Sequence, residues 1–377
     1  MQVEKKRIAF IFIEEIHHLY HFISIAIELS KYENVHILTF PHQDHLLEQT
    51  LENLGGHKVK VERRSTKLFR AITDKLKKRK FPRAGFWMQN NQKYILKNFD
   101  AVVFTDYNHH KLLKAKNKLD SDIKFIKLPH GIAGRKYVYK KDLLDFDFHL
   151  IFGQFYANEL RNRKLLTAHK VIGYPKLETI NKLNKEPVFK NSKPTVIYNP
   201  HFTAPFSSWH KFGQEILDYF YYQDQYNLIF APHINLFNKR GGSDNNSIPD
   251  KFYNAQHIHI DLGSIDSVNM RYTLDADIYL GDVSSQVFEF ILQPRPVIFI
   301  NANQVDYKND IGYRLWQTGN VISDLSNFEE MLQNSQKNFE NFKPIQKIIN
   351  TENIYQSDES SPSERGSKAI IEFLAED

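Results

Sequence analysis

Residues 278–300 of the chain read IYLGDVSSQVFEFILQPRPVIFI. The apolar run Ile278–Leu280 is typical of a buried strand, Ser285–Leu292 has the pattern of a short helix, and Val297–Ile300 is a second apolar run. A strand, a helix and a strand in this order predict two parallel strands that are joined by a crossover helix. This unit decides the fold class, because the same alternation extends over most of the chain.

Outward from this unit, the sequence predicts two groups of strands with helices between them. The other predicted strands are Ile8–Ile13, Val35–Phe40, Lys58–Glu62, Ala101–Thr105, Lys124–Leu128, His149–Phe152, Thr195–Tyr198, Asn227–Ala231 and His257–Asp261. The other predicted helices are His21–Lys31, His45–Leu54, Phe212–Tyr222 and Ser267–Leu274. The polar stretch Lys182–Pro194 is a candidate linker. The sequence therefore predicts an α/β protein with two Rossmann-like domains.

The expected domains are residues 1–172 and 173–377. The second is expected to include a final helix that runs through Leu374. Ser361 followed by Pro362 and Glu364 is a capping box, which predicts where this helix begins.

Composition narrows the class of protein. The 377 residues are more than one core usually holds, and 41% hydrophobic and 25% charged residues are ordinary for a folded chain. A net charge of +6 suits an anionic partner, whether nucleic acid, phospholipid headgroups or a phosphorylated substrate. The absence of cysteine excludes disulfides and thiolate metal sites.

The first apolar run ends at Glu14 and Glu15, too early for a signal-peptide core. No run approaches the ~20 apolar residues that span a bilayer. We therefore expect a cytoplasmic protein that can associate with the inner face of the cell membrane.

Two histidines directly follow predicted strands. Ligands of parallel sheets bind at the carboxyl ends of the strands, which is where His130-Gly131 and His233 are expected. With an ordinary pKa near ~6.5, an imidazole at His130 suits a general base that takes a proton from a hydroxyl. His233 suits a hydrogen bond or a charge directed at a phosphate oxygen. The alternative for both is an ordinary turn residue.

A third site follows the strand that ends at Leu280. Asp282, Ser284 and Ser285 lead into a helix whose free backbone N–H groups and dipole favour a phosphate. The alternative is plain N-capping by a serine. Asn199, after the strand that begins the second domain, is a further polar candidate, with a simple loop as its alternative. The chain contains no Walker A, G-x-G-x-x-G, H-E-x-x-H or G-x-S-x-G sequence.

Histidines also cluster at His17, His18 and His21, after the first strand. They lack a carboxylate at clear ligand spacing, so we interpret them as loop or acceptor-site histidines and predict no metal. A basic run, Lys77, Lys78, Arg79 and Lys80, precedes Trp87. Lysines beside an exposed aromatic wedge fit an anionic bilayer surface or an acceptor, and a solvated basic helix is the alternative. No nucleic-acid motif accompanies this patch, so no nucleic-acid partner is predicted.

Taken in order, these pieces resemble the CDP-glycerol glycerophosphotransferase family of teichoic-acid and capsule biosynthesis. The matching motifs are His130-Gly131, Gly173-Tyr174-Pro175-Lys176, Tyr198-Asn199-Pro200, Pro232-His233, Asp282-Val283-Ser284-Ser285, Phe288-Glu289-Phe290, Arg295-Pro296-Val297 and Ser363-Glu364-Arg365. Val283, Ile132 and Ala231 depart from the family pattern, and these departures bear on which polyol is transferred.

The resemblance implies a GT-B glycosyltransferase fold with two Rossmann-like domains facing across a cleft. It implies transfer of a polyol phosphate, glycerol phosphate first, from a CDP carrier to a hydroxyl of a glycan or lipid-linked acceptor. His130 and His233 would be catalytic, and Asp282, Ser284, Ser285, Asn199 and Gly131 would bind the donor. No cofactor is expected to be required. A nucleotide-sugar transferase of the same fold, and a non-catalytic membrane-associated binding protein, are the alternatives.

Overall fold

A computed structural model describes residues 4–13, 16–41, 45–77, 82–132, 138–183, 186–238, 241–244 and 247–376. The chain divides into two compact units. The first comprises residues 1–131, 139–184 and 352–377, and the second comprises residues 132–138 and 185–351. The boundary near residue 184 lies in the stretch that the sequence indicates as a linker.

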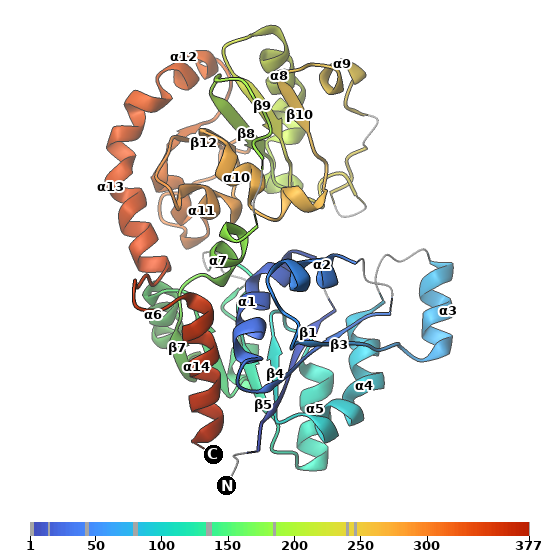
Figure 1. Cartoon of the computed structure of the whole chain (residues 1–377). Helices are drawn as coiled ribbons and strands as arrows, with labels where there is room; N and C mark the ends of the chain where they lie inside the picture. The colour runs from blue at the N-terminus through green and yellow to red at the C-terminus, as the bar shows by residue number, and fades with distance from the viewer. Residues whose placement is uncertain are drawn as a thin grey trace. The chain divides into compact units, whose positions relative to one another are not determined.

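The first unit is built on a parallel sheet in the order β3-β2-β1-β4-β5-β6-β7 (Figure 1). Its strands are β1 (Arg7–Phe12), β2 (Asn34–Thr39), β3 (Lys60–Arg63), β4 (Ala101–Phe104), β5 (Lys124–Lys127), β6 (Phe148–Ile151) and β7 (Ala168–Val171). Its helices are η1 (Ile16–His18), α1 (Leu19–Leu29), α2 (Leu46–Asn53), α3 (Leu68–Leu76), α4 (Ala84–Asn98), α5 (His110–Leu119), η3 (Lys141–Asp145), α6 (Gln154–Asn162), α7 (Pro175–Asn181) and α14 (Pro362–Ala375).

The second unit repeats this plan with the parallel order β10-β9-β8-β11-β12-β13. Its strands are β8 (Thr195–Asn199), β9 (Asn227–Phe230), β10 (Ile258–Ile260), β11 (Ile278–Gly281), β12 (Val297–Ile300) and β13 (Asn320–Ile322). Its helices are η4 (Ala204–Phe206), α8 (Trp209–Tyr222), α9 (Asp250–Tyr253), η6 (Ile265–Ser267), α10 (Arg271–Asp275), α11 (Gln286–Ile291), η7 (Ile311–Thr318), α12 (Phe328–Gln333) and α13 (Ser335–Asn353). The two Rossmann-like domains predicted from the sequence are confirmed.

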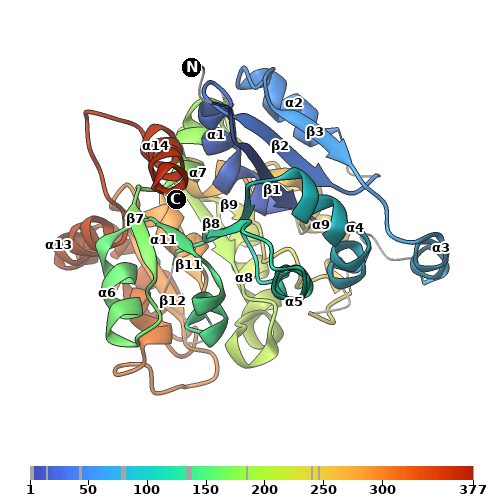
Figure 2. The ribbon, with the colours of Figure 1, turned by 90° about the horizontal axis from the view of Figure 1, so that it is seen from below.

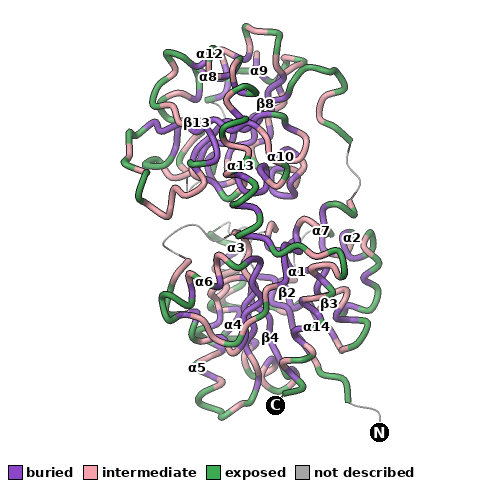
Figure 3. The backbone as a smooth tube through the Cα atoms, turned by 90° about the vertical axis from the view of Figure 1, so that its left-hand side faces the viewer, coloured by how far each residue is buried: buried purple, intermediate pink, exposed green. Residues whose placement is uncertain are grey.

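Buried residues are concentrated in the strands of both sheets (Figure 3). This burial is the reason that the strands appear in the sequence as continuous apolar runs. In each unit the strand order reverses beside the first strand, between β1 and β4 and between β8 and β11. Such a switch point opens a crevice at the carboxyl ends of the strands, where ligands of open parallel sheets bind.

The final helix corrects the expected domain division, because α14 belongs to the first unit. The Ser361 and Glu364 capping box is present as predicted. The helix packs on α1, with the Gly366 backbone so close to Ile25 that a Cβ would lie 3.1 Å from that side chain. Arg365 donates to the carbonyl of Ile172 over 2.9 Å. These contacts hold the C-terminal helix on the first sheet.

No helix among the described residues combines the length and apolar character needed to cross a bilayer.

Candidate functional site

A cavity of about 380 Å³ lies at the carboxyl end of the second sheet. Residues that follow β8, β9 and β11 line it, together with residues of η7. The lining includes His201, Phe202, His233, Asp282, Ser284, Ser285, Tyr313, Arg314 and Trp316. The structure therefore brings together four of the residues predicted from the sequence: His233, Asp282, Ser284 and Ser285.

Backbone contacts set the tautomer of His233. Its Nδ1 lies 3.1 Å from the backbone N–H of Asn235, which can only donate. Nδ1 is therefore the acceptor, and the neutral ring carries its proton on Nε2. A partly exposed His233 at the cavity thus offers an N–H donor, the group that a phosphate oxygen needs.

Asp282 is fully buried at the inner side of the cavity. Its Oδ2 accepts the backbone N–H groups of His201 at 2.9 Å and Ser208 at 2.8 Å. Its Oδ1 has no hydrogen-bond partner among the described residues. Burial raises the pKa of this carboxyl to about 7, against the effect of the two backbone donors. Near neutral pH the group is often uncharged, so it can lie beside an anionic ligand.

The two serines have different environments. The Ser284 Oγ accepts the backbone N–H of Gln286 at 3.2 Å and is buried, so it acts as a local cap. The Ser285 side chain is exposed at the cavity and makes no capping hydrogen bond. Ser285 is therefore the better placed of the two to bind a ligand.

Asn199 is predicted from the sequence to bind the donor, and its geometry argues against that role. The side chain is 1% exposed, donates to the carbonyl of Ala231 at 2.6 Å, and accepts from the hydroxyl of Tyr279 at 2.9 Å. It links three neighbouring strands instead of facing the cavity. Gly131 is also absent from the cavity lining, since it follows His130 in the first unit.

The helix η7 contributes Tyr313, Arg314 and Trp316 to the cavity and is not predicted from the sequence. Arg314 supplies a cationic side chain among aromatic rings, a combination suited to a phosphate beside a nucleoside. The predicted site residues all follow strands, whereas η7 precedes β13. The available signal in the sequence is Tyr313-Arg314-Leu315-Trp316, since Tyr, Arg and Trp are enriched at interaction surfaces.

In the first unit, His130 lies at the carboxyl end of β5. Its Nδ1 lies 2.6 Å from the carbonyl oxygen of Thr105, which can only accept. The ring proton is therefore on Nδ1, and Nε2 carries a lone pair, as a general base requires. Burial and the nearby Lys127 lower the pKa of His130. The buried Lys127 donates to the same carbonyl at 2.8 Å, and burial lowers its pKa to about 7.

Two groups of side chains in the described residues have the donor atoms to hold a metal ion. In the first group, one nitrogen from each of His17, His18 and His130 lies within 4.8 Å of the others. The second group is His109, His110 and Asp145. His21, which the sequence associates with His17 and His18, is buried against Phe152 and Tyr174 instead.

The basic patch is only partly as predicted. Lys77 is exposed, whereas Lys78, Arg79 and Lys80 lie outside the described residues. Trp87 was expected on the surface, but it is fully buried and donates to the carbonyl of Arg64 at 2.6 Å. Its ring faces the core from α4, so it cannot contact a bilayer.

The exposed apolar surface of this region is on α3. Leu68, Phe69, Ile72 and Leu76 are 78%, 67%, 50% and 77% exposed. Both views show α3 at the periphery of the first unit (Figures 1 and 2).

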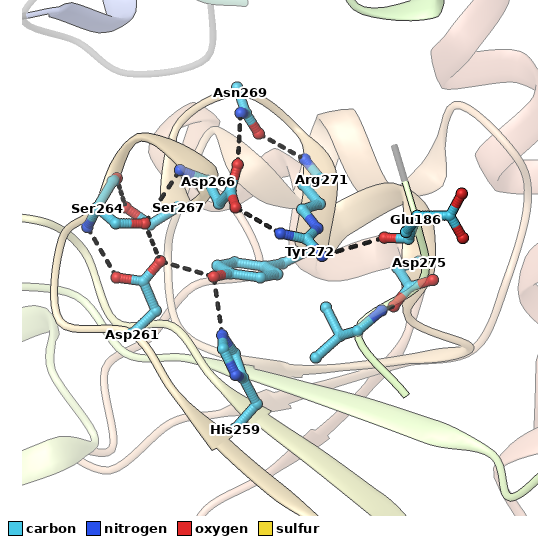
Figure 4. Close-up of polar contacts among 11 residues, drawn as sticks. Glu186, His259, Asp261, Ser264, Asp266, Ser267, Asn269, Arg271, Tyr272 and Asp275 are labelled. Atoms are coloured by element: carbon cyan, nitrogen blue, oxygen red, sulfur yellow. Dashed lines mark hydrogen bonds and ion pairs between the residues drawn. The ribbon is translucent and has the colours of Figure 1, made fainter. Parts of the chain in front are cut away.

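Polar contacts outside the cavity lining also support the second sheet. The loop after β10 is held by Asp261, which accepts from Gly263, Ser264 and Tyr272, while His259 contacts the Tyr272 hydroxyl (Figure 4). Arg295 donates to backbone carbonyls of α10 and α11 and of the residues that follow them. Burial lowers its pKa to about 10. The Arg-Pro motif is thus structural, because this side chain fastens two helices beside the cavity.

No protein-family model and no curated protein matches the chain in sequence. Solved structures do match in fold. A variant of the wall teichoic acid polymerase TagF, in a crystal soaked with CDPG, is 13% identical, with a TM-score of 0.64 over 99% of this chain and 90% of that chain.

The UDP-GlcNAc 2-epimerase of Neisseria meningitidis bound to UDP-GlcNAc is also 13% identical, with a TM-score of 0.60 over 98% of this chain and 100% of that chain. A putative UDP-N-acetylglucosamine 2-epimerase of Listeria monocytogenes is 11% identical, with a TM-score of 0.64 over 99% of this chain and 96% of that chain. At these identities the likeness concerns the fold, and the chain has the GT-B fold.

Proposed function

We propose that the chain transfers a polyol phosphate, glycerol phosphate first, from a CDP carrier to a hydroxyl of a glycan or lipid-linked acceptor. The main support for this proposal is the cavity of the second unit. There His233 offers an N–H donor, Ser285 a hydroxyl and Arg314 a cationic group. These groups suit a pyrophosphate. The fold shared with the TagF structure and the ordered motifs support a CDP-linked donor.

In this proposal His130 is the base. Its Nε2 takes the proton of the acceptor hydroxyl as the oxygen attacks the polyol-bearing phosphorus. The new P–O bond forms while the bond to CMP breaks, and CMP leaves with the electron pair. His233, Ser285 and Arg314 stabilise the charge on the phosphate oxygens. A base of this kind contributes ~10²–10⁴ in rate.

The test is CMP release from CDP-glycerol by the purified protein, with and without a lipid-linked or polymer acceptor. His130→Ala should lower acceptor-dependent release by ~10²–10⁴-fold and leave donor affinity within about threefold. Ser285→Ala and Arg314→Ala should weaken donor binding by ~10-fold or more, since each loses a hydrogen bond to a charged group. The exposed residues His57 and His210 supply matched His→Ala controls in the two units.

The donor panel also decides between rival activities. The epimerase structures match as well as TagF does, so UDP-GlcNAc belongs in the panel with CDP-ribitol and other nucleotide sugars. Acceptor-dependent turnover of CDP-glycerol supports the proposal. Epimerisation of UDP-GlcNAc without an acceptor contradicts the proposal. Release of the nucleotide from a nucleotide sugar, with none from CDP-glycerol, contradicts it as well.

We further infer that the protein binds the anionic inner face of the cell membrane through α3. Within Leu68–Leu76 the exposed side chains are apolar or basic, and the acidic Asp74 is buried and paired with Arg83 at 3.1 Å. Lys67, Lys75 and Lys77 flank the apolar residues. An apolar face with basic flanks suits an anionic lipid surface, which offers an apolar interior to the face and negatively charged headgroups to the lysines.

A further inference from the structure

Three histidines from separate parts of the first unit meet at its switch point. His17 and His18 follow β1, and His130 follows β5, on either side of β4. The rings of His18 and His130 are stacked, with centroids 4.1 Å and planes 29° apart, and the centroids of His17 and His18 are 4.4 Å apart. Because an imidazole lone pair lies in the ring plane, one of the stacked rings must turn for both to bind one ion. One nitrogen of each ring lies within 4.8 Å of the other two.

Thr105, directly after β4, orients two of these rings. Its carbonyl accepts from Nδ1 of His130 at 2.6 Å, and its Oγ1 lies 2.9 Å from Nδ1 of His18. The hydroxyl can accept a hydrogen bond from His18, which leaves Nε2 of both rings as donors of a lone pair. Metal-binding histidines commonly give their other N–H to an oxygen in this way.

We propose that His17, His18 and His130 bind one divalent transition-metal ion of the Zn²⁺, Co²⁺ and Ni²⁺ class through their imidazole nitrogens. Imidazole suits these ions, whereas Mg²⁺ and Ca²⁺ prefer the oxygen ligands that this group lacks. His17 and His130 are partly exposed, which gives the ion a path to the site and leaves a coordination position for solvent.

Lys127 acts against this ion. Its Nζ shares the Thr105 carbonyl with His130 and also donates to the carbonyl of Asp106 at 3.2 Å. A cationic group that shares a carbonyl with His130 weakens the binding of a second cation at that ring. The geometry therefore makes an unusual prediction, that removal of a buried charge at Lys127 strengthens metal binding.

The ion would occupy Nε2 of His130, the atom that the proposed function needs as a base. The expected effect of the ion rests on the proposed function. The ion is inhibitory, because the metal-free enzyme transfers the polyol phosphate and the metal-bound enzyme does not. Binding itself requires no donor and no acceptor, so it is measured separately from transfer.

The test is titration of the metal-free full chain with Co²⁺, followed by its visible absorption, and with Zn²⁺ by calorimetry. We expect one ion per chain, with affinity at least ~10-fold lower in His17→Gln and His130→Gln, and lower by ~10–100-fold in Thr105→Val, which removes an outer-shell acceptor. Lys127→Met should bind more tightly. His57→Gln should match the wild type, and so should His110→Gln, which alters the other histidine group.

Unchanged affinity in both His17→Gln and His130→Gln overturns the proposal, and so does loss of binding in His110→Gln alone. His17 and His130 are partly exposed, so these variants test the site without removing the buried His18 ring. If no donor is turned over but Co²⁺ binds as expected, the transfer proposal fails and the metal site stands. Transfer without Co²⁺ binding overturns the metal site and supports the transfer proposal.

Discussion

Asp282→Asn is predicted to stabilise the second unit at alkaline pH. The folded carboxyl has a pKa of about 7 against an ordinary value of 3.8, because it is buried. A carboxyl with a raised folded pKa favours folding below its unfolded pKa, and this contribution is lost as the pH rises through about 7. The difference between the two pKa values lowers the free energy of unfolding by about 4 kcal/mol at pH 8. Asparagine avoids this cost and keeps an oxygen for the two backbone donors.

Fluorescence can report this effect from the second unit alone. The chain has three tryptophans, of which Trp87 is in the first unit and Trp209 and Trp316 are in the second. In a Trp87→Phe background, urea unfolding monitored by tryptophan fluorescence follows the second unit, which matters because two-unit chains do not unfold in one step.

Asp282→Asn should raise the free energy of unfolding by up to about 4 kcal/mol at pH 8, and the gain should shrink toward pH 5. Asp277→Asn is the control, since this exposed carboxylate also accepts a backbone N–H, from Thr195 at 2.8 Å. An Asp282→Asn protein that is less stable than the wild type at every pH would refute the reasoning. It would mean that the bonds from His201 and Ser208 to the ionised carboxylate outweigh its desolvation.

Three further predictions concern the scaffold and the membrane face. Arg295→Met should destabilise the second unit by roughly 3 kcal/mol or more in the same urea assay, because buried carbonyls lose their donor; equal stability would contradict the fastening role. Ser361→Ala should lower the stability of the first unit by about 1 kcal/mol through loss of the capping box, as measured by thermal unfolding followed at Trp87 in a Trp209→Phe, Trp316→Phe background; no change would show that the box is redundant. Phe69→Ser should reduce sedimentation with anionic vesicles, whereas Leu119→Ser, at an exposed leucine of α5, should not; equal binding by both variants would remove α3 from the membrane face.

The sequence predicts the buried strands such as β4 from their apolar runs. The two edge strands of the first sheet have no fully buried residue, and of these β3 is predicted whereas β7, Ala168–Val171, is not. The surface position predicted for Trp87 is wrong because a basic run nearby in the sequence suggests exposure. Which face of α4 carries the ring decides its burial, and the basic run does not indicate that face. The final helix is evident from its cap, but its partner α1 lies more than 300 residues earlier in the chain.

The candidate site was predictable where one strand end carries several polar residues. Asp282, Ser284 and Ser285 follow a single strand, so parallel-sheet geometry alone places them together. Arg314 enters from η7, and Thr105 holds both His18 and His130 from a third strand. Such contacts depend on which loops face one another, and no local pattern encodes that.

His130 and His233 look alike in sequence, each directly following a strand, and the backbone gives them opposite chemistry. A carbonyl beside Nδ1 of His130 forces the proton onto Nδ1 and leaves Nε2 as an acceptor. An amide N–H beside Nδ1 of His233 forces the proton onto Nε2, which becomes a donor. A general base must accept a proton, whereas a group that binds a phosphate oxygen must donate a hydrogen bond. These tautomers therefore fit the two proposed roles and would not fit if exchanged. Nitrogen-15 spectra of the imidazole rings should therefore show opposite tautomers at His130 and His233. The same tautomer at both would withdraw one of the two roles while leaving the fold and the cavity in place.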